Sequence, residues 1–167
     1  MAKRYYIIEQ DDVRATCLPN AQFDTNVFQP HIEPAELQYI KPFLGADFYD
    51  PLVVEYLAGT LTAANENLLA NYLKPMLAWY VYAKASPFMH ISTKSGGFFV
   101  NNSEFSQGAS SQQRNELYVV IIQNAEALAD KAKKFIEDNA TLYPLYEVGG
   151  NIDNNTSFTG GLILDKE

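Results

Sequence analysis

The run from Glu36 to Met89 constrains the fold more than any other part of the sequence. It holds three successive segments of helical periodicity that are rich in apolar and aromatic residues. Such segments are unstable in water unless they pack against one another or against a partner. The same run contains no arrangement of side chains typical of a catalytic site. The sequence therefore predicts a packed helical domain whose work is assembly rather than chemistry.

The first predicted helix opens at Pro34, a residue type favoured in a first helical turn, and stops at Gly45. Glu33 and Glu36 are placed near the positive end of its dipole. Pro42 falls inside the pattern and is expected to kink or tighten the last turn. The apolar positions of this helix recur at helical spacing, at Leu37, Ile40 and Leu44.

Two further helices complete the run. One covers about residues 46–58 and ends at Gly59, and the next begins after Thr62, a good N-cap, and extends toward residue 89. Pro75 removes one backbone hydrogen bond from the longer helix, so the sequence predicts a bend near residues 71–74.

A fourth helix is predicted from Ser110 or Ser111 to about Asn139. Val120 is expected beside its apolar seam. The seam consists of Leu117, Ile121, Ala125, Leu128, Ala132 and Phe135.

The fold class is therefore all-α, a helical bundle of about four helices. Residues 1–31 are predicted as an extended and irregular N-terminal arm, residues 32–146 as the helical domain, and residues 147–167 as an extended C-terminal tail. A long Gly- and Ser-rich loop, residues 90–111, precedes the last helix, and a loop of that length is usually functional or disordered.

Composition and charge exclude several classes of protein. The net charge is −8, and no basic stripe is present that could neutralise a run of phosphates, so tight nucleic-acid binding is not expected. The longest apolar run, from Met76 to Ala83, is far shorter than the roughly 20 residues of a membrane-spanning helix. Cys17 is the only cysteine, which rules out an internal disulfide. We expect synthesis in a cytoplasmic compartment and no contact with a membrane.

The search for catalytic chemistry gives no candidate. His31 and His90 lack partners at metal-ligand spacing, and the acidic pair Asp47 and Asp50 is explained by its place at the start of a helix. The stretch 94–97, Lys-Ser-Gly-Gly, lacks the residue order of a phosphate-binding loop. We expect no catalytic residue, no cofactor and no metal.

The order of these segments resembles the head–tail connector (adaptor) proteins of tailed bacteriophages, including those of crAss-like phages. Four segments carry the resemblance, and together they span about residues 32–146: PAELQYIKPFLGADFYDPL, NENLLANYLKPMLAWYVYAKASPFM, KSGGFFVNNSEFSQGASSQQRNELY and FIEDNATLYPLY. These are motifs of fold and packing rather than of catalysis. The arm and the tail depart from the pattern.

The resemblance implies a structural protein of the virion that forms a ring, of twelve copies, between the portal vertex of the capsid and the tail. Its partners would be other copies of itself, the portal protein, and tail or further adaptor ring proteins. DNA would pass through the channel of the ring without specific binding. Twelve copies at −8 each carry a formal charge of −96, and we expect part of it to line that channel and to repel DNA.

Contacts with neighbours are expected from the aromatic and apolar residues outside the helical seams. These residues are Tyr5 and Tyr6 of the arm, Phe98, Phe99 and Phe105 of the loop, and Leu162, Ile163 and Leu164 of the tail, the last three as a clamp. An alternative is a soluble helical scaffolding or regulatory module that binds a peptide or protein in an aromatic groove. A helical enzyme for a small molecule is a third and weaker hypothesis, because no polar side chains converge in the sequence.

Overall fold

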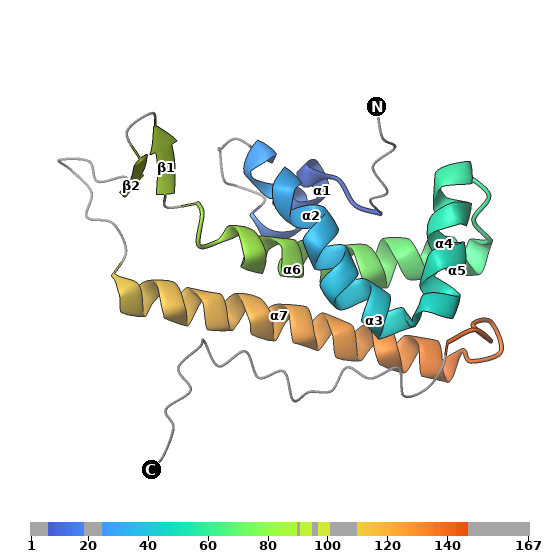
Figure 1. Cartoon of the computed structure of the whole chain (residues 1–167). Helices are drawn as coiled ribbons and strands as arrows, with labels where there is room; N and C mark the ends of the chain where they lie inside the picture. Colours follow the sequence, from blue (N-terminus) through green and yellow to red (C-terminus); the bar gives the residue numbers. More distant parts are fainter. Residues whose placement is uncertain (1–6, 19–24, 90, 95–96, 101–109, 147–167) are drawn as a thin grey trace, which may run out of the picture.

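The fold is an all-α helical bundle, as the sequence predicts (Figure 1). The computed structural model describes residues 7–18, 25–89, 91–94, 97–100 and 110–146. The helices are α1 (Gln10–Cys17), α2 (Gln29–Ala35), α3 (Lys41–Leu44), α4 (Ala46–Ala58), α5 (Ala63–Leu68), α6 (Lys74–Ala85) and α7 (Ser111–Asp138). Shorter turns join them, namely the 3₁₀ turn η1 (Thr25–Phe28) and the π-helical turns η2 (Glu36–Ile40) and η3 (Leu69–Leu73).

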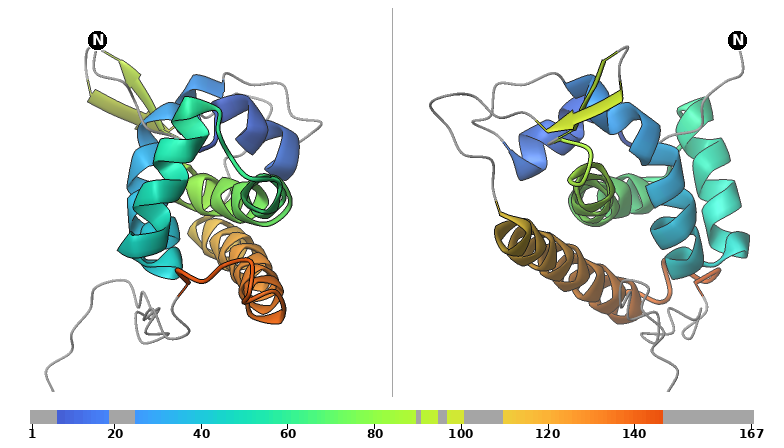
Figure 2. Two further views of the ribbon diagram at one scale, coloured as in Figure 1. Left: turned by 90° about the vertical axis from the view of Figure 1, so that its right-hand side faces the viewer. Right: turned by 60° about the vertical axis from the view of Figure 1, so that its left-hand side comes forward.

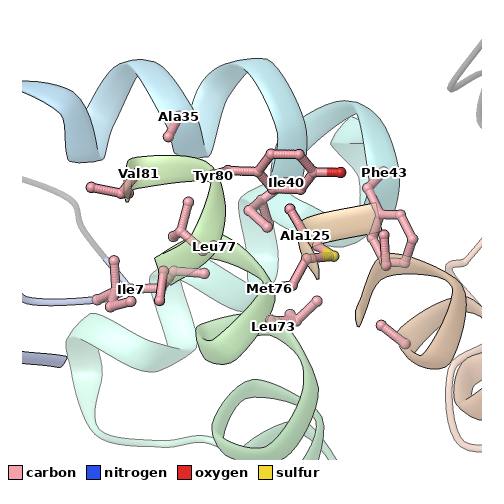
Figure 3. Packing of buried hydrophobic residues seen from close by; sticks show 14 of the residues in the cluster. Ile7, Ala35, Ile40, Phe43, Leu73, Met76, Leu77, Tyr80, Val81 and Ala125 are labelled. Carbon is pink, nitrogen blue, oxygen red and sulfur yellow. The ribbon is translucent and has the colours of Figure 1, made fainter. Parts of the chain in front are cut away.

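Helix α6 lies at the centre of the molecule. Figures 1 and 2 show α7 running antiparallel to it on one side and α1 and α2 crossing it on the other. Met76, Leu77 and Val81 of α6 are fully buried, and Figure 3 shows Ile7 of the arm approaching them from one side and Ala125 of α7 from another. The predicted aromatic run thus forms the core of the bundle.

The N-terminal arm packs across this core. The sequence predicts an irregular segment, but residues 10–17 form the helix α1, which begins with a capping box between Glu9 and Asp12. Ile7, Ile8 and Val13 are fully buried. At about 1.5 to 3 kcal/mol for a buried aliphatic side chain, these three residues anchor the arm to α6.

The first long helix starts earlier than the sequence predicts. Residues 29–44 are continuously helical, with Pro30 in the first turn and Pro34 inside α2. The predicted start at Pro34 was wrong because Pro30 meets the same requirement for a fixed φ one turn earlier. Glu36 consequently lies in the middle of this helix rather than near its positive end.

Pro42 and Pro75 are accommodated in the same way, by a widened π-helical turn directly before each Lys-Pro pair. The backbone N–H of Lys41 donates to the carbonyl of Glu36, five residues back, and that of Lys74 donates to the carbonyl of Leu69. A proline ring clashes with the carbonyl four residues earlier, and a wider turn relieves that clash. The helix before Pro75 departs from regular α-helix near the position at which the sequence predicts a bend, and the turn before Pro42 is widened and not tightened.

Helix α7 contains 28 residues and is about 42 Å long. Ser110 caps its start, with a reciprocal capping box to Gln113. The loop before it contains an antiparallel hairpin of strands β1 (Ile91–Lys94) and β2 (Gly97–Val100), in which Ile91 pairs with Val100. After α7 the chain turns back, and Tyr143 donates a hydrogen bond of 2.9 Å to the carbonyl of Ala64.

Candidate interaction surfaces

Two of the residues predicted to contact neighbours lie on the hairpin. Phe98 and Phe99 are in β2, paired with Thr93 and Ser92 of β1. The other predicted contacts lie outside the described residues: Tyr5, Tyr6, Phe105, Leu162, Ile163 and Leu164. The structure does not test their roles, and all eight remain predictions.

Two of the titratable residues considered above, His31 and Asp50, have ordinary structural partners. His31 stacks on the ring of Phe88 at 5.1 Å, and burial, followed by the charge of Lys84, lowers its pKa. Asp50 forms a 2.8 Å ion pair with Lys41 at the surface. Across the described part of the chain, no three His, Cys, Asp or Glu side chains lie close enough together to hold a metal ion.

Glu36 is the only charged residue among the buried residues that the structure describes. Its side chain is 1% exposed and accepts two hydrogen bonds, one of 3.2 Å from the backbone N–H of Ile7 and one of 2.7 Å from the hydroxyl of Tyr49. The first bond joins the arm to η2, and the second joins η2 to α4. A single carboxyl group therefore links three segments that are distant in sequence.

Burial governs the titration of this pair. Desolvation raises the pKa of Glu36, and the hydrogen bonds from Tyr49 and Ile7 only partly oppose it. Burial also raises the pKa of Tyr49, and the neighbouring Glu36 adds to the effect. With both oxygens of Glu36 engaged inside the core, the arrangement supports a structural link rather than proton transfer to a ligand.

Two tyrosines that precede the Lys-Pro pairs occupy matching sites on partner helices. Tyr39 stacks on Tyr80 of α6 at 3.9 Å, with Lys84 Nζ 5.8 Å from the centre of its ring. In the second site, Tyr72 stacks on Phe135 of α7 at 4.1 Å, and Lys131 Nζ is 5.3 Å from its ring centre.

In both sites the lysine and the aromatic residue are four positions apart on one helix, so both can reach the same tyrosine ring. These contacts fix the spacing of α6 against η2 and of α7 against η3.

The first half of α7 carries an exposed apolar patch. Leu117, Val119 and Val120 are 42%, 52% and 51% exposed, and we call them the α7 patch. Val119 and Val120 line a shallow depression together with polar residues of the same helical face, namely Gln112, Asn115 and Glu116. Leu117 was predicted in the core seam, and this expectation was wrong.

A second exposed apolar patch lies on α4. Val54 is 65% exposed and Leu57 39% exposed, and Ala58 continues the same stripe. We call these three residues the α4 patch. Figures 1 and 2 show α4 at one end of the molecule and the start of α7 at the opposite end. The two patches therefore lie on different helices, toward opposite ends of the molecule.

Helical periodicity predicted neither patch. It identifies the apolar positions of a helix but does not show over what length a partner helix covers them. The sequence nevertheless contained a signal for the α7 patch, namely the number of apolar residues in one segment. The segment 117–122, Leu-Tyr-Val-Val-Ile-Ile, is apolar around the whole helix, which is more than one packed face requires.

Within the described residues, no helix has the length and hydrophobicity needed to cross a membrane. A family model described as a family of unknown function, DUF6712, matches residues 40–156. No curated protein and no solved structure matches the chain.

Proposed function

The chain belongs to the DUF6712 family, whose function is unknown, and we propose that it is a virion structural protein forming a ring at the portal vertex of a tailed phage. The ring would join the capsid portal to the tail or to a further adaptor ring. The observation that carries the proposal is the pair of exposed apolar patches at opposite ends of the subunit.

A closed ring requires head-to-tail contacts, in which one surface of each subunit binds a different surface of the next. The α7 patch and the α4 patch supply two such surfaces on one rigid bundle. Exposed apolar residues that cluster on a monomer are typical of protein contacts. The resemblance of residues 32–146 to phage connectors supports the same assignment and supplies the expected copy number of twelve.

The charge of the subunit fits a ring that encloses DNA without binding it. The chain carries 20 acidic and 12 basic side chains. An acidic channel wall repels the phosphate backbone and lets the genome slide. Glu36 takes no part in such a wall because it is buried.

The decisive experiment measures the mass and shape of the assembly. The purified chain is examined alone and together with the portal protein encoded by the same genome, by mass photometry and negative-stain electron microscopy. Twelve copies of 18.7 kDa give a ring of about 224 kDa, closed by a single type of interface. A chain that stays monomeric in both samples and does not bind the portal would contradict the proposal.

A further inference from the structure

The first half of α7 buries one apolar face and exposes two valines among polar residues on the opposite face. Ile121 and Ala125 point into the core and are buried, whereas Val119 and Val120 lie on the other side of the helix and remain half exposed. The exposed apolar residues share one face with Gln112, Asn115 and Glu116, which follow the i, i+3, i+4 spacing of a helical stripe.

The two halves of α7 also differ in charge. Residues 111–125 contain one arginine and one glutamate, whereas residues 126–138 contain four acidic and three basic side chains. A helical face in contact with water normally carries charged residues, as the second half does. The exposed face of the first half therefore carries a single acidic residue, Glu116, and two valines that are available to an apolar partner.

The chain itself supplies a segment of matching character. Residues 147–167 are rich in Gly, Asn and Thr and contain one run of three apolar residues, Leu162, Ile163 and Leu164. The acidic residues Asp165 and Glu167 follow the run. The ring of Tyr146, the last described residue before this tail, packs against the ring of Phe43, with 6.1 Å between the ring centres.

The length of the tail suits a return along its own helix. From Asp138 to Val120 the helix rises by about 27 Å. A flexible Gly-rich linker as long as residues 147–161 has a root-mean-square span of about 22 Å and a maximum of about 50 Å. A linker whose average span is close to the separation of two sites gives a high effective concentration of one at the other.

We propose that Leu162, Ile163 and Leu164 fold back onto the α7 patch of the same chain and shield it from water. In this orientation Asp165 and Glu167 approach the N-terminal end of α7, where the backbone N–H groups carry partial positive charge. The contact lies within one chain and holds whether or not the protein forms rings. A neighbour that uses the α7 patch must first displace the tail.

Disulfide trapping tests the contact directly. Cys17 is replaced by Ala, so that the only thiols are those introduced by Ile163→Cys together with Val120→Cys or, as the matched control, Ala127→Cys. Ala127 is exposed, lies seven residues further along the same helical face and is closer to the start of the tail. A tail without a docking site would therefore react at position 127 at least as fast as at position 120.

Oxidation at low micromolar concentration, followed by non-reducing gels and peptide mass spectrometry, gives the rates. We expect the disulfide to form at least about fivefold faster at position 120 than at position 127, and within single chains. Equal rates, a faster reaction at position 127, or a disulfide that joins two chains would overturn the proposal.

Hydrogen exchange provides a second measurement without cysteines. Replacing Leu162, Ile163 and Leu164 by Ser should reduce the protection of backbone amides in residues 114–122 by several-fold and leave residues 128–136 unchanged, because only the first half loses its cover. Unchanged protection in residues 114–122 would overturn the proposal, even if the substituted chain still assembled with a portal.

Discussion

At the scale of single residues, Glu36 has the most consequential position in the molecule. Its two carboxylate oxygens accept from the arm and from α4, so its removal leaves the Ile7 N–H and the Tyr49 hydroxyl without partners in the core. Each buried polar group that loses its partner costs about 1 to 3 kcal/mol. The residue therefore determines whether the arm stays attached.

We expect Glu36→Ala to lower the free energy of unfolding by about 3 kcal/mol, since it leaves two buried donors unpaired. Urea denaturation followed by circular dichroism measures the change. Glu33→Ala, at an exposed position three residues earlier in the same helix, is the control and should change stability by less than about 0.5 kcal/mol. Equal effects of the two substitutions would show that the hydrogen bonds of Glu36 do not hold the arm.

Glu36 also gives the protein a pH dependence of unusual sign. Its pKa is raised in the folded state, so between the ordinary value of 4.5 and the raised value the folded chain binds more protons than the unfolded chain. Stability from this group is fully present below pH 4.5 and is lost as the pH rises through the folded-state pKa.

Denaturation of the wild type and of Glu36→Gln across this range isolates the effect, because all other carboxyl groups are common to both proteins. We expect the stability of the wild type relative to the Gln variant to fall as the pH rises. A difference that stays constant or rises with pH would contradict the raised pKa.

At the scale of helices and turns, the pattern Tyr-(Ile/Leu)-Lys-Pro-(Phe/Met)-Leu occurs twice, at residues 39–44 and 72–77. In each copy the tyrosine lies in a π-helical turn and stacks on an aromatic residue of a neighbouring helix. The π-helical turn, the stacked tyrosine and the Lys-Pro pair thus occur together in both copies. The sequence predicted a disturbance at both prolines but not their shared geometry.

The Tyr72 site permits a direct measurement of this packing. In a double-mutant cycle with Tyr72→Leu and Phe135→Leu, we expect a coupling energy of about 1 kcal/mol, the value typical of stacked aromatic pairs. Chemical denaturation of the four proteins gives the number. Tyr39→Leu combined with Phe135→Leu is the control pair, whose effects should add because Tyr39 packs on Tyr80 instead. Additive effects at Tyr72 and Phe135 would rule out the coupling.

Sequence periodicity predicts some of these helices better than others. Helical periodicity located the long helices, because a repeat of 3.6 residues directly reflects burial on one face. Periodicity failed at Leu117, where the apolar repeat of α7 continues although α6 no longer covers it. Ile121 is buried, whereas Leu117, one turn earlier, lies toward the start of α7, which Figure 1 shows reaching past the end of α6. The position at which a partner helix ends depends on the tertiary structure, and a local sequence pattern does not predict it.

At the scale of the whole molecule, the position of the two patches predicts how subunits should combine. In a head-to-tail contact the α7 patch of one copy meets the α4 patch of the next, and a single defective patch leaves the other surface intact. In a symmetric dimer each patch would meet its own copy. The two arrangements respond differently when variants are mixed.

We therefore expect Val54→Asp and Val120→Asp each to abolish ring formation, because an aspartate at the centre of an apolar contact is buried without a partner. Mixing the two variants restores one intact interface, between the α7 patch of the first and the α4 patch of the second. The mixture should contain a dimer of about 37 kDa, twice 18.7 kDa, but no ring.

Analytical ultracentrifugation of each variant and of the equimolar mixture measures this outcome. Both variants also carry Ser at positions 162–164, so that the tail does not compete for the α7 patch. Asp substitution of Lys133, an exposed residue in the second half of α7, is the control for added negative charge and should leave assembly intact. A dimer formed by either variant alone would indicate a symmetric contact and exclude the head-to-tail arrangement, because a ring of this kind needs both patches on every subunit.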